Sequence, residues 1–383
     1  MKILFLAPHP FFAERGTPIA VRLAIEALSR QGHSIDLLTY HEGQDIEVPG
    51  VRLLRISGPP GARNVPIGFS IKKLICDVWL AVAAYRLIFR NRYDVVHGVE
   101  ESVFIALAAR PFRKFRLVYD MDSLMSDQIA EKWPKAGLLL PVLYWFEKLA
   151  MRRADLVLPV CEAIAVRARE ATAPAKVHLL PDVAFAASET SSGVEDLRAH
   201  CSSPAPLALY VGNLEHYQGV GLLLDAMEKL PAAERCNLVV IGGTPTMVED
   251  HRRMAVEKGL DGNIRFLGHR PIDNLGNYLR QADILCSPRL KGVNTPMKIY
   301  SYMAAGKAIL ATDIASHTQV LDDACAMLVA PDAQAMADGL GRLIGDAGLR
   351  DRLGAASARR AGEEYSLAAF EGRITRAYAT LAA

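Results

Sequence analysis

Three cationic side chains surround the predicted start of a short helix in the C-terminal half of the chain. Arg289 and Lys291 lie in a polar loop that follows an apolar strand, and Lys298 lies one turn inside the helix. Thr295 is predicted to be the N-cap, and Pro296 suits the first helical position. Because a helix N-terminus carries unpaired N–H groups and about half a positive charge, this segment predicts a site for an anion such as a phosphate.

The whole chain fits a two-domain globular protein. Its 383 residues are 51% hydrophobic, and its formal net charge of +2 provides no bulk field that would favour nucleic acid. The six cysteines form no C-x-x-C pair, which indicates reduced thiols in a cytoplasmic setting and predicts no zinc site. Residues 1–7 are too few for the core of a signal peptide, and we expect no segment that spans a membrane.

Apolar strands and amphipathic helices alternate through the chain and predict an α/β protein with two doubly wound, Rossmann-like domains. The first domain is predicted over residues 1–183 and the second over residues 207–365. Residues 184–206 are rich in Ser, Thr, Pro and Gly, which is typical of a linker. Residues 366–383 are predicted to form a C-terminal helix that packs back on the first domain.

Polar residues follow three predicted strands of the first domain, where a doubly wound sheet places its ligands. They are Arg15, Gly16 and Thr17 after the strand 2–7, Glu100 and Glu101 after the strand 93–97, and Asp120 and Asp122 after the strand 116–119. Each carboxylate fits helix capping as well as chemistry, and the sequence leaves both interpretations open. The chain has no G-x-G-x-x-G motif, which disfavours a dinucleotide-dependent dehydrogenase.

Two predicted helices of the first domain, residues 70–90 and 137–153, combine apolar and aromatic residues with Lys and Arg. One interpretation is a basic, aromatic face that rests on a bilayer surface. The other is that both helices pack on the sheet. The second is favoured from the sequence, because each helix carries too many apolar residues for a one-sided stripe.

Five segments of the second half resemble, in order and spacing, family 4 of the retaining nucleotide-sugar glycosyltransferases. They are 211–220 (VGNLEHYQGV), 241–243 (IGG), 266–269 (FLGH), 282–284 (ADI) and 302–313 (YMAAGKAILATD). This resemblance implies the GT-B fold, in which two Rossmann-like domains face each other across a cleft. It also implies a nucleotide diphosphate-sugar donor, transfer with retention of anomeric configuration, and no requirement for a metal or another cofactor.

The resemblance further implies a role for individual residues. Arg289, Lys298 and Asp122 are the predicted catalytic residues, and Arg15, Glu100 and Glu101 lie on the acceptor side. The predicted donor-binding residues are Gly16, Thr17, Asn213, Gln218, Gly242, Gly243, Gly268, His269, Arg270, Lys291, Asn294, Thr295, Pro296, Met297 and Ser301. In this interpretation the leaving phosphate itself takes the proton of the acceptor.

The sequence departs from the family pattern at five positions. Asn213 and Gln218 stand where the family usually has Arg and Lys, and Val293 and Ser301 stand where it has two glutamates. Asp122 replaces a histidine. The lost cations must be offset by others if a diphosphate is bound, and a serine hydroxyl holds a ribose more weakly than a carboxylate does.

These departures leave two other hypotheses beside a retaining glycosyltransferase. One is a nucleotide-sugar-binding partner subunit without turnover, and the other is a GT-B epimerase of a nucleotide sugar. The expected partners of a transferase are the donor, a glycan, lipid-linked or small-molecule acceptor, and a peripheral membrane contact, with no nucleic acid. We expect the protein in the cytoplasm, at the inner face of the membrane if that contact forms.

Overall fold

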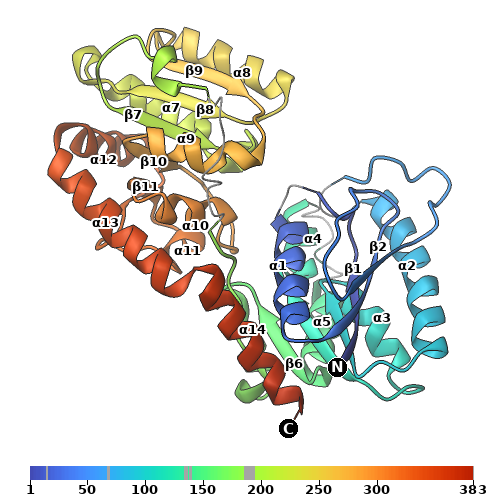
Figure 1. Cartoon of the computed structure of the whole chain (residues 1–383). Helices are drawn as coiled ribbons and strands as arrows, with labels where there is room; N and C mark the ends of the chain where they lie inside the picture. The colour runs from blue at the N-terminus through green and yellow to red at the C-terminus, as the bar shows by residue number, and fades with distance from the viewer. Residues whose placement is uncertain (14–15, 67–69, 133–136, 138–139, 185–194, 383) are drawn as a thin grey trace. The chain divides into compact units, whose positions relative to one another are not determined.

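The computed structural model describes residues 1–13, 16–66, 70–132, 137, 140–184 and 195–382. The chain divides into two compact units, each with its own sheet and core (Figure 1). Unit 1 comprises Met1–Pro181 and Phe370–Ala383, and unit 2 comprises Asp182–Ala369. The chain therefore returns to unit 1 at its C-terminal end.

Unit 1 is built on six parallel strands in the spatial order β3-β2-β1-β4-β5-β6. They are β1 (Lys2–Ala7), β2 (Ser34–Thr39), β3 (Val51–Arg55), β4 (Val95–Val99), β5 (Arg116–Met121) and β6 (Leu156–Pro159). β1, β4 and β6 are fully or almost fully buried, as expected for strands that helices cover on both faces.

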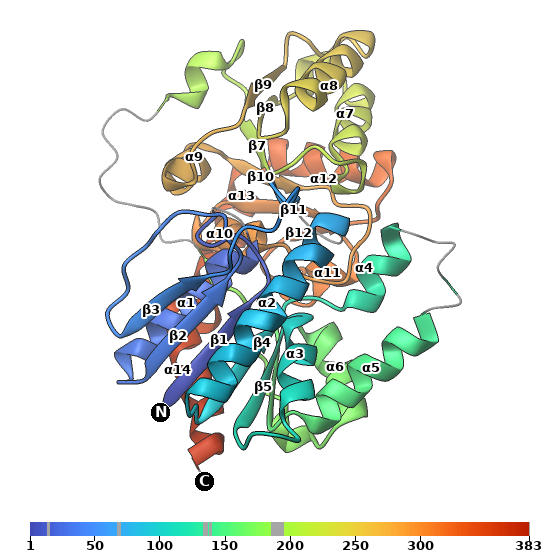
Figure 2. The same cartoon turned by 90° about the vertical axis from the view of Figure 1, so that its right-hand side faces the viewer.

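The helices of unit 1 are α1 (Gly16–Arg30), α2 (Ile71–Arg90), α3 (Ser102–Ala109), α4 (Met125–Lys132), α5 (Leu140–Arg153), α6 (Glu162–Ala171) and α14 (Leu367–Ala382). Figure 2 shows α2, α3 and α5 on one face of the sheet, with α1 and α14 behind it. Leu4 and Leu6 of β1 belong to the core under α2, α3 and α5. On the other face, Phe5 stacks on His97 at 3.8 Å, and His97 Nδ1 lies 2.6 Å from the hydroxyl of Tyr378 in α14. α14 thus helps to complete the core of unit 1.

Unit 2 repeats this plan with six parallel strands in the order β12-β11-β10-β7-β8-β9. They are β7 (Leu207–Val211), β8 (Asn237–Ile241), β9 (Ile264–Gly268), β10 (Ile284–Ser287), β11 (Ala308–Thr312) and β12 (Met327–Val329). Numbered within each unit, the strand order of the two sheets is the same. In both, the first strand lies beside the fourth, so the chain winds outward in opposite directions from that pair.

The helices of unit 2 are α7 (Val220–Lys229), α8 (Pro245–Glu257), α9 (Leu275–Gln281), α10 (Met297–Ala304), α11 (Ala315–Thr318), α12 (Ala333–Gly345) and α13 (Ala347–Glu364). Ala208 and Tyr210 of β7 pack in the core under α7, α8 and α12. Leu207 and Leu209 point to the opposite core, which contains α9 and α10. This alternation is the period of a strand buried on both faces.

Several local expectations need correction. Asp120 does not follow its strand but lies inside β5, where its carboxylate is 3.0 Å from Nε2 of His97. Of the helix expected over residues 137–153, the structure describes α5 from Leu140 to Arg153, and residues 138–139 lie outside the described residues. In the described residues, no helix is both long and apolar enough to cross a membrane.

Candidate functional site

The fold places the first candidate site at the carboxyl ends of β7 and β10. These neighbouring strands are the point in sheet 2 from which the chain winds in opposite directions. Ligands of doubly wound sheets bind in the crevice outside such a pair. Gly219, at φ +75, allows the loop after β7 to pack on the loop after β10, since a Cβ there would lie 1.8 Å from the carbonyl oxygen of Pro288.

Lys298 of α10 turns its ammonium toward this crevice. Its Nζ donates to Oε1 of Gln218 at 3.1 Å and lies 4.1 Å from the centre of the Tyr210 ring. Burial, followed by the nearby Arg289 guanidinium, lowers the pKa of Lys298 to about 7. An amide oxygen and an aromatic face stabilise an ammonium less than a carboxylate does. The site therefore holds a positive group that lacks a counter-anion among the contacts described for it.

Arg289 brings a second cation to the same crevice. Its Nη1 donates to the carbonyl oxygen of Asn294 at 2.8 Å, and its guanidinium lies 5.5 Å from the centre of the Tyr217 ring. Gly292 makes room for this arrangement, because a Cβ there would lie 2.3 Å from Nη2 of Arg289. The guanidinium is thus folded against its own loop, close enough to lower the pKa of Lys298.

The start of α10 differs from the prediction by one residue. The N-cap is Pro296, not Thr295, and no side chain caps the helix. The hydroxyl of Thr295 is buried, and Oγ1 has no hydrogen-bond partner in the described part of the chain. The first N–H groups of a helix have no carbonyl partner inside it. An acceptor group of a ligand would satisfy both the hydroxyl and these amides, from Met297 and Lys298.

We call this group the anion site: Gln218, Arg289, Thr295, Lys298 and the first amides of α10. A buried network behind it fixes the position of Arg289. The hydroxyl of Thr312 donates to the carbonyl oxygen of Arg289, and Nε2 of His317 lies 2.9 Å from Oγ of Ser287. Nδ1 of His317 lies 2.8 Å from the carbonyl oxygen of Thr312. Burial lowers the pKa of His317 to about 4, so this ring is neutral and structural.

Other predicted donor-binding residues line the same edge of sheet 2 with different local roles. Gly242, at φ +119, packs against the backbone of Gly212, and its amide donates to the carbonyl oxygen of Gly268 at 2.8 Å. The carbonyl oxygen of Asn213 accepts from the Tyr210 hydroxyl at 2.6 Å. The remaining residues at these strand ends and in the loop after β10 are Gly243, His269, Lys291 and Asn294.

Two predicted residues lie apart from the anion site. The guanidinium of Arg270 is paired with Glu195 through contacts of 2.8 and 3.2 Å, so its side chain serves the packing of residues 195–200. Ser301 is 3% exposed and borders a cavity of about 400 Å³ with Leu275, Ala304 and Tyr365 among its walls. The site thus gathers Gln218, Arg289 and Lys298, but not these two.

A second cluster lies at the corresponding edge of unit 1, beyond β1 and β4. Nζ of Lys73 lies 2.6 Å from Oε1 of Glu101 and 3.5 Å from Oε2 of Glu100. The hydroxyl of Ser123 donates to Glu100 at 2.6 Å, and the hydroxyl of Tyr40 donates to Asp77. We call Lys73, Asp77, Glu100 and Glu101 the acid cluster. Three carboxyl groups here share one ammonium.

The charges of the acid cluster are strongly coupled. Burial raises the pKa of Glu101 and that of Asp77, whereas Lys73 and the Ser123 hydroxyl hold the pKa of Glu100 below its usual range despite burial. One ammonium cannot balance three buried carboxylates, so the cluster retains a proton near neutral pH. Glu100 also has φ +48, a conformation that side chains other than glycine rarely adopt. Such backbone is often found at functional sites.

The other predicted residues of unit 1 lie beside the acid cluster or at the start of α1. Asp122 follows β5, next to Ser123, which contacts Glu100. Gly16 and Thr17 form the start of α1. Arg15 lies outside the described residues.

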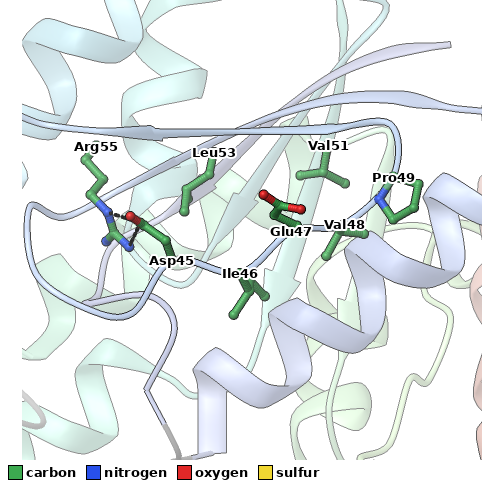
Figure 3. Close-up of a pocket in the computed structure, with 8 residues that line it drawn as sticks. All are labelled: Asp45, Ile46, Glu47, Val48, Pro49, Val51, Leu53 and Arg55. Carbon is green, nitrogen blue, oxygen red and sulfur yellow. Dashed lines mark hydrogen bonds and ion pairs between the residues drawn. The ribbon is translucent and has the colours of Figure 1, made fainter.

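Unit 1 also has an open cavity of about 870 Å³ along its edge strand β3 (Figure 3). It lies between β3 and residues 45–49, and most of its lining is aliphatic. Its one drawn ion pair joins Arg55 to Asp45 at 2.8 Å. The two charges satisfy each other, and no set of polar groups converges there as it does at the two strand pairs. We therefore place the functional site at the strand pairs.

Sequence reasoning missed several groups at both sites. Lys73, Asp77 and Tyr40 are far from Glu100 in sequence, and the cluster forms only when α2 packs on β2 and β4. Tyr210 lies in β7 and Tyr217 in the motif that follows it, and nothing in the sequence showed that their rings would face cations. A residue that follows a strand can be recognised from the local sequence. A residue on a distant helix that packs against the end of that strand cannot.

Two family models match the chain, one to each unit. Residues 15–182 match a glycosyl transferase 4-like domain, and residues 205–346 match glycosyl transferases group 1. Among solved structures, the sucrose-phosphate synthase of Thermosynechococcus elongatus has a TM-score of 0.79 at 21% identity, covering 99% of this chain and 98% of that one. HepE of Anabaena in complex with UDP has a TM-score of 0.75 at 17% identity, covering 99% and 100%. Fold and strand order are those of GT-B proteins.

Curated relatives match over a shorter stretch. The D-inositol 3-phosphate glycosyltransferase of Xylanimonas cellulosilytica is 34% identical over 175 residues, which is 43% of this chain and 41% of the relative. The phosphatidyl-myo-inositol mannosyltransferase of Mycobacterium leprae is 31% identical over 183 residues, 45% and 46% of the two chains. The match thus spans less than half the length of either relative. With both units matched by family models, the chain belongs to the glycosyltransferases of the family 4 type.

Proposed function

We propose that this protein is a retaining glycosyltransferase that binds the diphosphate of a nucleotide diphosphate-sugar at the anion site. The observation that carries the proposal is the convergence of Arg289, Lys298 and the open start of α10 on the β7–β10 strand pair. The buried Thr295 hydroxyl supplies a further donor that has no acceptor among the described residues. Two cations, a hydroxyl and backbone amides are the groups that a pyrophosphate requires.

The family pattern has two cations in the loop after β7 that this chain lacks, and the anion site supplies positive charge in their place. Gln218 stands where the family has a lysine, and the ammonium that contacts its amide comes from Lys298 of α10. The positive charge reaches that place from a helix instead of from the loop after β7. In the same way, Arg289 lies over Tyr217 of that loop. We infer that the charge of the site is preserved by different residues.

In the proposed reaction, the bond between the anomeric carbon and the diphosphate oxygen breaks while a bond to the acceptor oxygen forms on the same face. The departing diphosphate gains negative charge, which Arg289 and protonated Lys298 stabilise more in the transition state than in the bound donor. The proton of the acceptor hydroxyl passes to the leaving phosphate oxygen. These cations replace a metal ion in this role, so the proposal requires none.

Binding of a diphosphate would also offset the free-energy cost of burying the Lys298 ammonium near Arg289. Without a ligand, burial and Arg289 favour the neutral amine. A nearby dianion favours the ammonium and raises its pKa, so donor binding takes up a proton near neutral pH. This predicts that nucleotide affinity falls as the pH rises above about 7.

We assign the acceptor to unit 1, at the acid cluster. Carboxylates accept hydrogen bonds from hydroxyl groups, so Glu100 and Asp122 suit a polyhydroxylated acceptor, either a glycan, a lipid-linked sugar or a small molecule. The relatives named for inositol-containing compounds support an acceptor rich in hydroxyls. The neighbours solved with UDP and UDP-glucose support a nucleotide-sugar donor. All six cysteines are free thiols, which suits a cytoplasmic enzyme.

A panel of UDP-, GDP- and ADP-sugars tests the proposal. Calorimetry with each nucleotide measures binding, and proton NMR of the product identifies the anomer. We expect at least one nucleotide diphosphate to bind and its sugar to be transferred with retention. Absence of binding to every nucleotide would refute the anion site.

The same panel separates the two alternatives. A partner subunit without turnover binds a donor but gives no product, and the Arg289→Ala variant then changes only affinity. An epimerase isomerises the donor in the absence of any acceptor, which the NMR spectrum of the sugar reveals directly.

A further inference from the structure

Helix α2 has an apolar face on each side. Cys76, Leu80, Ala84 and Ile88, spaced by four residues, are buried against sheet 1. The opposite side exposes a second apolar stripe that runs the length of the helix: Ile71 (73% exposed), Leu74, Val78 (58%), Trp79, Val82 and Phe89. Isolated surface hydrophobics need no explanation, but a continuous stripe usually marks an interaction site.

Helix α5 and the loop after α3 extend this stripe. Trp145 is 59% exposed, and Val142, Tyr144 and Phe146 on the same helix are also exposed. Phe112, in the loop after α3, is 73% exposed. In the described residues, eleven of the fourteen large hydrophobics classed as exposed lie on α2, on α5 or in this loop. The remaining three are scattered over other elements.

Direct contacts join these elements into one surface of unit 1. The Phe104 ring of α3 meets the Phe146 ring of α5 edge to face at 6.4 Å. The guanidinium of Arg113 lies 5.3 Å from the centre of the Phe89 ring at the end of α2. Figure 2 shows α2, α3 and α5 side by side on the same face of sheet 1. We call the exposed side chains of α2, residues 110–116 and α5 the α2–α5 surface.

The charge of this surface has a single sign. Within the fully described segments 71–90, 110–116 and 140–153, every exposed side chain that carries a charge at neutral pH is Lys or Arg: Lys72, Arg86, Arg90, Arg113, Lys114, Arg116, Lys148, Arg152 and Arg153. The two acids in these segments, Asp77 and Glu147, are turned inward, to Tyr40 and to Ser126. The protein as a whole is almost neutral, at +2. The positive charge is therefore concentrated where the apolar side chains are exposed.

We propose that the α2–α5 surface docks on an anionic lipid bilayer. Trp, Tyr and Phe with flanking Lys and Arg are the groups that reside at the boundary of headgroups and acyl chains. The apolar stripe supplies burial in that boundary, and the cations are attracted to acidic headgroups. A second copy of the chain would bring like charges together, which disfavours a dimer through this surface. None of the described helices can cross the membrane, so this contact is peripheral.

Vesicle binding tests the inference with the full-length protein and no nucleotide, so the outcome does not depend on the proposed reaction. Co-sedimentation with vesicles of equal parts phosphatidylglycerol and phosphatidylcholine should capture the protein, and vesicles of phosphatidylcholine alone should capture far less. High salt should release it, because screening weakens attraction to the surface. Brominated lipids should quench Trp145 and Trp79, which Trp145→Phe and Trp79→Phe variants assign.

Two sets of substitutions at exposed positions separate the two forces. Arg86→Gln, Arg90→Gln and Lys148→Gln together should weaken binding to anionic vesicles about a hundredfold, at about fivefold for each charge. Trp145→Ser should weaken binding about tenfold, because an aromatic side chain no longer enters the boundary. The matched controls, Arg253→Gln and Val256→Ser on α8 of unit 2, are also exposed and should change nothing.

Three results would overturn the inference. The first is no binding to anionic vesicles by a protein whose circular dichroism shows it to be folded. The second is binding that is equally strong to both kinds of vesicle and that the charge substitutions do not change. The third is a dimer in analytical ultracentrifugation that Trp145→Ser dissociates, since the surface would then be covered by a second copy.

Discussion

The two units have the same strand order, yet their equivalent strand pairs carry opposite chemistry. Beyond β1 and β4, unit 1 places three carboxyl groups around one ammonium. Beyond β7 and β10, unit 2 places two cations, a helix N-terminus and no acid among the described contacts of Lys298. Topology fixes where each crevice lies, and the side chains decide which ligand it accepts. One unit suits hydroxyl groups and the other an anion.

The two clusters also differ in how their charges are satisfied. Lys73 has its counter-ions within the protein, so the acid cluster contributes to folding. Lys298 has an amide oxygen and an aromatic ring instead, so its charge is costly until a ligand arrives. Substitutions should therefore affect stability in unit 1 and ligand binding in unit 2.

The largest expected effect is on the stability of unit 1. Lys73→Met leaves buried carboxylates without a partner and should lower the free energy of unfolding by about 3–5 kcal/mol. Lys72→Met, one residue away and exposed, should change it by about 0.5 kcal/mol or less. Urea denaturation followed by tryptophan fluorescence reports on this unit, because Trp79, Trp133 and Trp145 all lie in its sequence. Equal effects of the two substitutions would contradict the ion pairing described for Lys73.

Removing a cation of unit 2 should affect turnover more than folding. Arg289→Ala should lower kcat about 10²- to 10³-fold, because one preorganised donor to the leaving group is lost. Arg289→Lys keeps the charge but not the fork of donors and should restore part of the rate. The control is Arg253→Ala on α8, an exposed arginine paired only along its helix. Steady-state kinetics with the preferred donor measures the difference, and an unchanged kcat would exclude Arg289 from the reaction.

The features of the fold and of the candidate sites that could be predicted from the sequence are those whose residues lie close together along the chain. Arg289, Lys298 and the helix between Pro296 and Gly306 are close in sequence, so their meeting with a strand end was predictable. The N-cap was misplaced, because Thr295 has the side chain of a cap and sits before a proline, yet its hydroxyl is buried and Pro296 takes that position. Lys73 and Glu100 meet only through the packing of α2. The sequence raised an exposed basic, aromatic face on α2 and α5 but favoured packing of both helices on the sheet, because apolar composition does not show which face a neighbour covers.

Thr295 gives a smaller effect that separates ligand binding from folding. Thr295→Val keeps the shape of the side chain and removes a buried hydroxyl that has no described partner. Nucleotide affinity should fall about tenfold or more, since a hydrogen bond to a charged group is lost. The free energy of unfolding without ligand should stay the same or rise, because no internal hydrogen bond is broken. Thr318→Val, at an exposed hydroxyl on α11, should leave both unchanged. Calorimetry and urea denaturation check the two halves of this prediction.

A separate effect is the pH dependence that Lys298 gives to stability. Its pKa is about 7 in the folded protein and 10.5 in the unfolded chain. Between these values the unfolded state binds one proton more than the folded state, so the free energy of unfolding rises with pH in this window. Lys298→Met should remove that rise and raise stability most below pH 7, where the folded protein carries the buried charge. Lys258→Met is the control: Asp225 and Glu228 raise the pKa of Lys258, so it stays charged throughout the window in the folded protein. Urea denaturation of the three proteins at several pH values decides the matter, and a slope that persists in Lys298→Met would show that the ammonium is not buried without a counter-ion.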